Sequence, residues 1–286
     1  MDSEVRKKYE EAQAISEKAQ DLAKKEINED GSVLKLAEMV EKDIVENGGK
    51  LAFPINISIN EIAAHFTPEM NTNLKFKVED LVKIDIGVHI DGYIWDAAFT
   101  KKIGTGKDDM IDASEQALQA ALKVIKPGVK VCEISEVVES TVEGFGLKVV
   151  RNLCGHGLER FVQHAIPSIP NSRNKIQSEL QEGAIAMEIF TTNGEGYVKE
   201  SSETLIYRYL QDKNIRSQDA RKILAKARDE FQGMPFAKRW IQSIASGMKL
   251  ELALKELVDT GALEPYPVLK EARNGKVAQS ETTILL

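Results

Sequence analysis

The sequence predicts an α+β fold made of two similar α-α-β halves, and three observations support this prediction. Amphipathic helices come in pairs before each group of apolar, β-branched segments. A constant offset matches the helix that ends near Gly48 with the helix that ends near Gly146, which indicates an internal repeat. Each half then carries an acidic residue within an apolar strand, Asp85 in the first and Glu188 in the second. We therefore expect a pseudo-twofold arrangement with one interior site shared by both halves.

The helices are predicted from the spacing of apolar residues and from the residues at the helix ends. Ser32 has the side chain of a helix N-cap, the glycines after Glu46 end a helix in the usual way, and Pro127-Gly128 stops another. The predicted helices are residues 4–27, 32–46, 110–125 and 133–143. Strands are expected over residues 53–59 and 276–286.

A β-hairpin is predicted in the first half. Leu81 to Val88 and Tyr93 to Phe99 are rich in β-branched and aromatic residues, and Asp91-Gly92 between them is typical of a type I′ turn. With a loop of even length, residues an odd number of positions apart point to the same side of the hairpin. Asp85 and Asp96 therefore share one face, at a Cβ distance of roughly 7 Å.

Two neighbouring buried carboxylates repel each other, so this pair needs a partner. A bound metal ion would relieve the repulsion, and a buried arginine is the alternative. Asp85 would lie opposite Ala98, with Asp96 as its diagonal neighbour, so that both could reach one cation. The sequence therefore makes this hairpin the first candidate for a metal site.

Histidines and a last carboxylate add further candidate ligands. Of the four histidines, His156 and His164 lie together in a glycine-interrupted segment before the second acidic strand, and His65 lies in a polar segment after the first predicted strand. Glu281 is set within the apolar last strand; the alternative is that it faces solvent on a sheet edge. Neutral imidazole together with carboxylates suits Mn, Fe, Co or Zn better than Mg or Ca.

Residues 202–264 differ in charge from the rest of the chain, because they are nearly neutral while the remainder is acidic. Short helices are predicted over 204–210, 217–231 and 250–258, followed by an extended segment, which suggests a winged-helix-like insert. DNA binding is one interpretation, but the weak basic excess favours a structural lid or an interaction surface. We expect one domain made of residues 1–201 and 265–286, interrupted by this insert.

Composition limits the class of protein. The chain has 286 residues, 42% hydrophobic and 29% charged, which is typical of a soluble globular protein. A formal charge of −7 argues against a broad or specific nucleic-acid interface. The two cysteines, Cys132 and Cys154, together with the lack of a signal peptide or long apolar run, predict a cytoplasmic protein without a membrane span.

Five residues, Asp85, Asp96, His156, Glu188 and Glu281, stand in the order and contexts of the dinuclear metal site of one known family. The chain resembles the type II methionine aminopeptidases of metallopeptidase family M24, in their short archaeal form, over nearly its whole length. The shared motifs are Asp-x-Gly-x-x-x-Asp-Gly-x-x-x-Asp over residues 85–96, Ala-Ala-His-Phe-Thr-Pro over 63–68, Gly155-His156, Ala186-Met-Glu188 and Ala278-Gln-x-Glu281-x-Thr. The insert lies where type II members differ from type I.

The resemblance implies the "pita-bread" fold and two divalent metal ions, of Co, Mn, Fe or Zn. Asp85 would chelate one ion, Asp96 and Glu281 would bridge the pair, and His156 with Glu188 would hold the other. Glu188 would also be the general base. The residues implied to contact substrate are His65 and His164 at the scissile amide, and Phe53, Gln163, Phe190, Tyr266 and Leu269 in the methionine pocket.

Four positions depart from the family pattern. Ile189 replaces a common Pro or Thr, and Gln163 replaces an apolar residue of the pocket. Ser280 replaces an aromatic residue and Thr282 a histidine. Because these last two flank Glu281, we expect them to lower metal affinity.

The function implied is removal of the initiator methionine from nascent polypeptide N-termini when the second residue is small, with transient contact to the ribosome. An X-Pro aminopeptidase or prolidase is the alternative enzyme, although these relatives typically carry a large N-terminal domain, and only a short stretch precedes Phe53. A non-catalytic binding protein of the same fold is the second alternative, whose mark is the loss of metal ligands. We expect a monomer, while the sequence leaves open monomer versus dimer.

Overall fold

The computed structural model describes residues 1–286. Its α-helices are α1 (Ser3–Glu26), α2 (Val33–Glu46), α3 (Asp109–Val124), α4 (Val131–Glu143), α5 (Gln218–Asp229) and α6 (Gly247–Asp259), with a 3₁₀ helix over Lys238–Ile241. The strands are β1 (Lys50–Leu51), β2 (Asn56–Ile59), β3 (Ile62–Ala64), β4 (Leu81–Ile90), β5 (Tyr93–Lys102), β6 (Lys148–Val149), β7 (Cys154–Glu159), β8 (Val162–Pro170), β9 (Ala184–Thr192), β10 (Val198–Tyr209), β11 (Phe236–Ala237), β12 (Leu263–Glu271) and β13 (Val277–Leu285).

The four predicted helices of the two halves form close to their expected limits. The side chain of Ser32 accepts a hydrogen bond from the backbone N–H of Lys35 at 3.3 Å, so the predicted N-cap of α2 is confirmed. Asp2 caps α1 in the same way, with its carboxylate 2.8 Å from the N–H of Glu4. These caps fix where each helix begins, and the apolar stripe of each helix then faces the sheet.

A nine-stranded antiparallel sheet forms the centre of the molecule, in the order β1-β4-β5-β13-β9-β7-β8, with β2 paired to β4 and β6 to β9. The predicted hairpin is confirmed: Asp85 pairs with Ala98, and Asp91 and Gly92 have φ of 51° and 86°, as a type I′ turn requires. The last strand, β13, joins the two halves by pairing with both β5 and β9.

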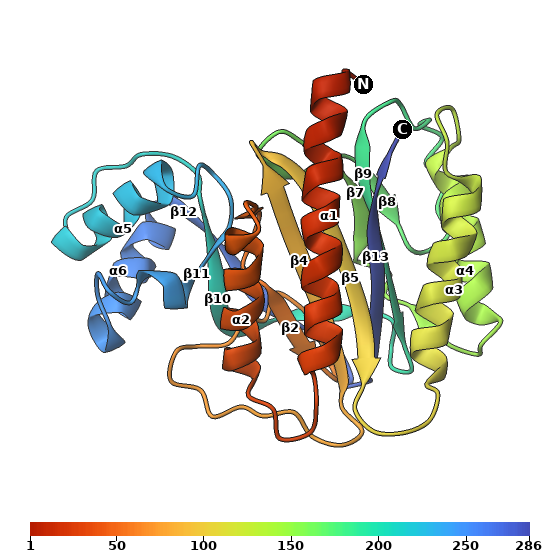
Figure 1. Ribbon diagram of the computed structural model, residues 1–286, viewed down its shortest axis with the longest axis horizontal. Helices are drawn as coiled ribbons and strands as arrows, with labels where there is room; N and C mark the ends of the chain where they lie inside the picture. Colours follow the sequence, from red (N-terminus) through yellow and green to blue (C-terminus); the bar gives the residue numbers. More distant parts are fainter.

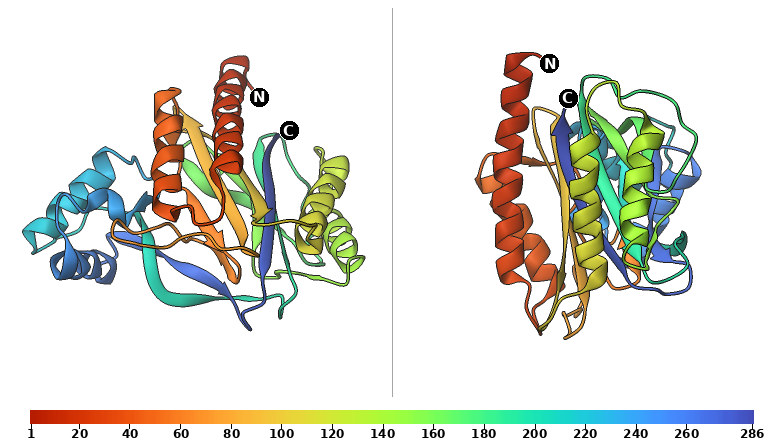
Figure 2. Two further views of the ribbon diagram at one scale, coloured as in Figure 1. Left: turned by 60° about the horizontal axis from the view of Figure 1, so that its bottom comes forward. Right: turned by 90° about the vertical axis from the view of Figure 1, so that its right-hand side faces the viewer.

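The helices α1, α2, α3 and α4 all cover one face of the central sheet (Figures 1 and 2). Alternate residues of β4, such as Ile84 and Ile86, pack with α1 and α2, and alternate residues of β9, such as Ile185 and Met187, pack with α3 and α4. Because side chains alternate along a strand, the intervening residues of β4, β9 and β13 point to the opposite, helix-free face. The paired halves confirm the predicted α+β class.

A second sheet, in the order β11-β10-β12-β3, lies over that helix-free face (Figure 2). Here one prediction is wrong: residues 204–210, expected to be helical, belong mostly to strand β10. Thr204 to Tyr209 pair with Pro267 to Leu263 of β12, so tertiary pairing overrides the local helical pattern. Strand β10 also runs across the predicted insert boundary at residue 202.

Between β10 and β12 the chain forms α5, the 3₁₀ helix and α6, which lie beside α2 at one end of the molecule (Figure 1). This segment has its own hydrophobic core, which includes Ile223, Leu224, Leu254 and Leu257. The winged-helix description of the insert stays a prediction. No helix of the chain combines the length and the apolar character needed to cross a membrane.

Candidate active site

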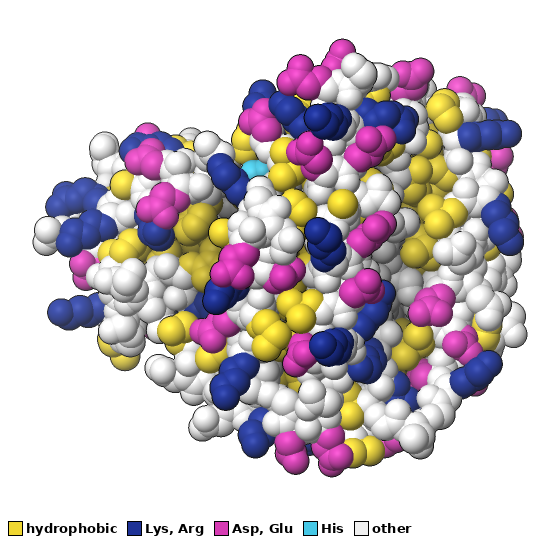
Figure 3. Space-filling model, viewed as in Figure 1, with side chains coloured by type: hydrophobic (Ala, Val, Ile, Leu, Met, Phe, Trp, Pro, Cys, Tyr) yellow, Lys and Arg dark blue, Asp and Glu magenta, His cyan; other side chains and the backbone are white.

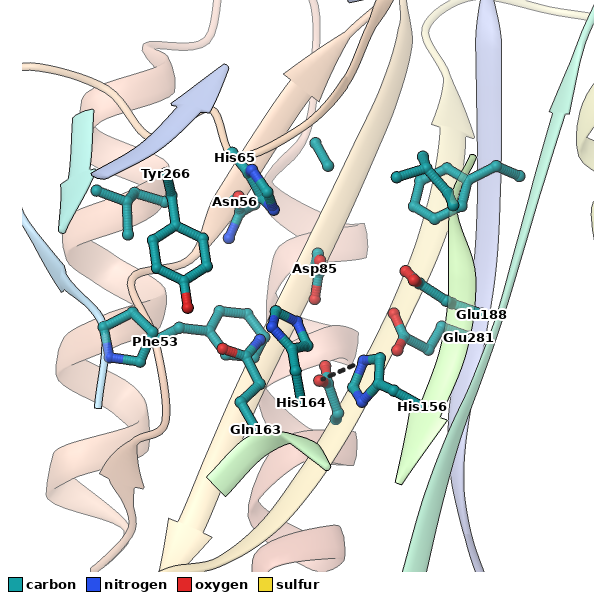
Figure 4. A pocket seen from close by; sticks show the side chains of 16 residues that line it. Phe53, Asn56, His65, Asp85, His156, Gln163, His164, Glu188, Tyr266 and Glu281 are labelled. Atoms are coloured by element: carbon teal, nitrogen blue, oxygen red, sulfur yellow. Dashed lines mark ion pairs between the residues drawn. The ribbon is translucent and has the colours of Figure 1, made fainter. Parts of the chain in front are cut away.

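The five residues expected to bind metal converge on the helix-free face of the central sheet. Asp85 of β4, Asp96 of β5, His156 of β7, Glu188 of β9 and Glu281 of β13 line one cavity of about 60 Å³ (Figure 4). The candidate ligand atoms of Asp96, His156 and Glu281 all lie within 4.8 Å of one another. His156 Nε2 is 4.0 Å from Asp96 Oδ2.

The strand register explains this convergence. Ala98 of β5 pairs with Asp85 on one side and with Glu281 on the other, and Glu281 pairs in turn with Glu188. Three carboxylates and one alanine therefore form a row across four adjacent strands. The small Ala98 side chain leaves space between the acidic ones, and Asp96 lies on the same face, two residues before Ala98.

Burial is the main influence on these side chains. It raises the pKa of Asp85 to about 7 and raises the pKa of Asp96, Glu188 and Glu281 well above the usual range, with repulsion from neighbouring carboxylates as a further cause for those three. Burial also lowers the pKa of the His156 imidazole to about 4. A cluster of carboxylates with one neutral imidazole can stay deprotonated at neutral pH when cations are bound beside it.

Local contacts fit the metal interpretation. Asp85 Oδ1 and Asp96 Oδ1 are buried and have no hydrogen-bond partner. His156 Nδ1 lies 3.3 Å from the carbonyl oxygen of Gly157, so a proton on Nδ1 leaves the Nε2 lone pair toward Asp96. These donors, carboxylate oxygens with one imidazole nitrogen, suit a divalent transition ion.

The alternative of a buried arginine does not describe this cluster. No arginine or lysine nitrogen lies within 4.0 Å of an oxygen of any of the four carboxylates, and the one histidine at that distance, His156 beside Asp96, has a neutral imidazole. Lys83, two residues before Asp85 on β4 and fully buried, instead donates to the carbonyl oxygens of Val277 at 2.8 Å and Asn60 at 3.0 Å. That lysine ties β13 and the turn after β2 to the hairpin.

Two further residues of the Ala278-Gln-x-Glu281-x-Thr motif, for which the sequence predicted no role, hold the cluster in place. Gln279 Nε2 donates to Glu281 Oε2 at 3.1 Å. The Thr283 hydroxyl accepts from the Asp96 N–H at 2.7 Å and lies 2.9 Å from the Asp96 carbonyl oxygen, to which it can donate. Both supports are two residues from Glu281, on its own face of β13, and this alternation was the available signal.

Ser280, one of the positions that depart from the family pattern, lies on the other face of β13. Its hydroxyl is 2.8 Å from that of Ser114 on α3. Thr282 has the same parity in the strand as Ser280, so the alternation of side chains directs it to the helix-covered face as well. The expected loss of metal affinity at these two positions stays a prediction, and the contacts give it little support.

Asn171 is a further residue that the sequence did not single out. Fully buried after β8, it donates from Nδ2 to the Glu188 carbonyl oxygen and accepts at Oδ1 from the Phe190 N–H, both at 2.7 Å. These bonds occupy the edge of β9 where Glu188 and Phe190 project into the cavity. Asn171 lies 17 residues before Glu188 in the chain, and no sequence motif connects the two residues.

The expected methionine-pocket residues fall into two groups. Phe53, Gln163, Phe190 and Tyr266 line the cavity that holds the carboxylates, but Leu269 lines an adjoining cavity of about 360 Å³ together with His65, His164 and Tyr266. The sequence missed several further lining residues, which are Asn56, Ala64, Leu153, Ile206 and Pro235.

The Phe53 ring packs closely against β4 because β4 carries Gly87 there. A Cβ at Gly87 would lie 2.2 Å from Cε1 of the Phe53 ring. Gly87 also pairs with Asp96 across the hairpin. The glycine of the Asp-x-Gly motif therefore lets an aromatic wall approach the carboxylates closely.

Two histidines stand where both cavities meet. The His164 ring packs edge-on against His156 with centroids 4.7 Å apart, and His65 packs edge-on against Tyr266 at 5.4 Å. His65 Nδ1 is 3.1 Å from the carbonyl oxygen of Pro267, which favours a proton on Nδ1 and a free lone pair on Nε2. Its φ of 63° is rare for a residue other than glycine and is often found at functional sites.

Comparisons with known proteins identify the family of this chain. The model of metallopeptidase family M24 matches residues 7–205. A methionine aminopeptidase of Thermococcus onnurineus is 46% identical over 253 residues, which cover 88% of this chain and 86% of that protein. Among solved structures, a thermophilic Arx1 (TM-score 0.87, 18% identity, 100% of this chain and 89% of that one) and the methionine aminopeptidase of Thermotoga maritima (TM-score 0.69, 21% identity, 100% and 94%) share the fold.

The fold and the buried carboxylate cluster define a metal-dependent peptidase. The chain belongs to metallopeptidase family M24 and, within it, to the methionine aminopeptidases. The predictions of the pita-bread fold and of a divalent-metal aminopeptidase are thereby confirmed.

Proposed function

We propose that this protein removes the initiator methionine from nascent proteins whose second residue is small. The observation that carries the proposal is the single cavity in which a metal-ligand cluster adjoins a wall that includes the aromatic side chains of Phe53, Phe190 and Tyr266. Transient ribosome contact, a monomeric state and a cytoplasmic location fit this role and stay predictions.

Two divalent ions, of Co, Mn, Fe or Zn, would be held by the five candidate ligands. Asp85 would bind one ion, His156 and Glu188 the other, and Asp96 and Glu281 both. When bound, such ions polarise a peptide carbonyl and make water nucleophilic at neutral pH. Glu281 suits a shared position because its strand neighbours place it between Ala98 and Glu188.

The chain's own side chains would position the substrate and move protons. Glu188 faces the cavity and would accept the proton of the attacking water at its carboxylate oxygen, as a general base. His65, with its Nε2 lone pair free, can accept a hydrogen bond from the scissile amide N–H. His164 lies beside His156 and can donate to the amide oxygen.

The wall selects the first residue of the substrate. A thioether side chain is flexible and polarizable, so it can fill a slot between Phe53, Phe190 and Tyr266 and contact their rings. Each unfilled methylene costs on the order of 1 kcal/mol or more, so an N-terminal alanine or glycine should be a poor substrate. The two histidines limit the space for the second residue.

One assay separates this proposal from an X-Pro peptidase. Met-Ala-Ser, Leu-Pro-Ser and Ala-Pro-Ser are compared at one metal concentration, with kcat/KM as the readout. The proposal predicts rapid cleavage of Met-Ala-Ser and slow cleavage of both proline peptides. Faster cleavage of the proline peptides would overturn the methionine specificity and leave only the metal chemistry.

A further inference from the structure

The insert is joined to the rest of the molecule by a buried ion pair. Arg239 of the 3₁₀ helix is 6% exposed and Glu41 of α2 is 8% exposed, and the guanidinium Nη2 donates to Glu41 Oε1. Trp240, the next residue, donates from Nε1 to Glu41 Oε2 at 3.1 Å. Burying two charges is costly unless further hydrogen bonds satisfy them, so the rest of this network decides what the pair does.

The other terminal nitrogen of the Arg239 guanidinium, Nη1, contacts the segment that carries His65. Arg239 Nη1 donates to the Thr67 hydroxyl and to the Pro68 carbonyl oxygen, the latter at 3.3 Å. Thr67 is two residues from His65, whose left-handed backbone must be held by its surroundings. One guanidinium therefore supports the segment after β3.

Glu41 carries the same network to the segment that holds Phe53. Its Oε1 accepts from the backbone N–H of Ile55 at 3.3 Å. Ile55 lies between Phe53 and Asn56, and both of these line the cavity. The insert is thus linked to two segments that carry wall residues, to one directly through Arg239 and to the other through Glu41.

We propose that Arg239 is a positioning residue, through which the insert holds Phe53 in the wall of the first-residue pocket and His65 at the scissile amide. This inference rests on the proposed function and assigns a role to the insert. The insert itself is a distinct lobe beside α2 (Figure 3), and a cavity of about 280 Å³ lies along this boundary, lined by Val45, Phe231, Met234 and Trp240 among others. The Arg239–Glu41 network fixes the lobe despite that gap.

Arginine is suited to this position because its planar, forked guanidinium presents several donors at once. A lysine ammonium could keep the charge near Glu41 but could not span both Glu41 and Thr67 with the same geometry. A valine at position 67 keeps the shape of Thr67 and removes only its hydroxyl. These two changes weaken the link without deleting the charge pair.

The test compares Arg239→Lys and Thr67→Val with the unmodified protein, and Arg228→Lys serves as the control. Arg228 is exposed on α5 of the same insert and pairs only with Asp212 and Asp229. For Met-Ala-Ser we expect KM to rise and kcat/KM to fall, by up to about 100-fold for misplaced site residues. The preference for Met-Ala-Ser over Ala-Ala-Ser should narrow, while the control should match the unmodified protein.

Metal affinity, measured by calorimetric titration with Mn²⁺, separates positioning from general damage. Arg239 touches no candidate ligand, so both variants should titrate like the unmodified protein. If either folded variant keeps KM and first-residue preference unchanged, or loses metal affinity in parallel with activity, the inference is overturned. Should Arg239→Lys fail to fold, Thr67→Val decides alone. If the unmodified protein does not cleave Met-Ala-Ser, the proposed function fails instead.

Discussion

The metal-ligand cluster and the substrate wall occupy one cavity but are built by different kinds of segment. The cluster, Asp85, Asp96, His156, Glu188 and Glu281, comes from five strands of one antiparallel sheet. The wall, Phe53, His65, Gln163, His164, Phe190 and Tyr266, also draws on the segment before β2, the segment after β3 and the second sheet. The cluster therefore depends on strand register, and the wall depends on how loops and the insert are held. Changes to each should have separable effects on metal binding and on substrate choice.

The largest effect is expected at the centre of the cluster. Glu281→Gln keeps the shape of the side chain but removes the charge of a carboxylate expected to contact both ions. Loss of a ligand should exceed the roughly 10- to 100-fold typical of supporting residues. Metal content by elemental analysis and kcat/KM should fall together, while Glu203→Gln, an exposed position on β10, should change neither. A Glu281→Gln protein that kept full metal content would contradict the assignment.

A smaller effect is expected where a neighbour supports the cluster. Gln279→Leu removes the hydrogen bond to Glu281, so metal affinity should weaken by about 10- to 100-fold. Ser280→Ala is the matched control, because Ser280 lies on the opposite face of the same strand and contacts Ser114. Calorimetric titration of both variants with Mn²⁺ would show whether only the side chain on the same face of β13 as Glu281 supports metal binding. Equal losses in the two would refute this account.

The sequence predicts the cluster well because strands obey simple geometry. Parity and the Asp91-Gly92 turn are enough to place Asp85 opposite Ala98, and the structure has that register. The supports of the cluster could not be predicted in the same way. Asn171 contacts Glu188 only because the chain after β8 returns to β9, between the residues of β9 that pair with β7 and those that pair with β6, and this is a tertiary arrangement.

The wall and the insert are where sequence reasoning fails. Residues 204–210 look helical by themselves, yet they pair with β12, because the second sheet offers them a strand partner. The family resemblance implies that Leu269 belongs to the methionine pocket, but in the structure Leu269 lines the adjoining cavity. The Arg239–Glu41 pair joins residues far apart in the chain, and no local pattern marks it.

The wall should respond to a change that leaves the cluster intact. Gly87→Ala would place a methyl group against the Phe53 ring, which must then shift. We expect KM for Met-Ala-Ser to rise about tenfold, equivalent to about 1.4 kcal/mol, with little change in Mn²⁺ affinity. Phe53→Leu with Gly87→Ala should recover part of the loss, because a smaller side chain removes the overlap. A lower Mn²⁺ affinity with an unchanged KM in Gly87→Ala would show that this position supports the cluster and not the wall.

The smallest effect on activity is expected at the link between the two sheets. Glu271 ends β12, and its carboxylate accepts from the backbone N–H groups of Glu195, Gly196, Arg273 and Gly275. Burial opposes ionisation, but these four bonds prevail and hold the pKa of Glu271 below its usual range. Its stabilisation is therefore present above the pKa of an unfolded glutamate and is lost as the pH falls through the lower, folded value.

Glu271→Gln should accordingly lower the free energy of unfolding by about 1.5–3 kcal/mol at pH 7. The difference from the unmodified protein should begin to shrink as the pH falls below the pKa of an unfolded glutamate, about 4.3, and should shrink further until the folded carboxylate is protonated. Denaturant titrations at pH 7 and at the acidic pH measure this difference in the free energy of unfolding. In the folded protein, without denaturant, kcat/KM should change little. A difference that grew on acidification would contradict the assigned contacts.

All activity of this protein should depend on metal bound by the cluster, and removal of that metal by chelation shows whether it does. The protein is freed of metal, its metal content is verified, and cleavage of Met-Ala-Ser is followed as Co²⁺, Mn²⁺ or Fe²⁺ is added back. We expect no cleavage without metal and a recovery that saturates as the five-ligand site fills. Full activity in verified metal-free protein would contradict it.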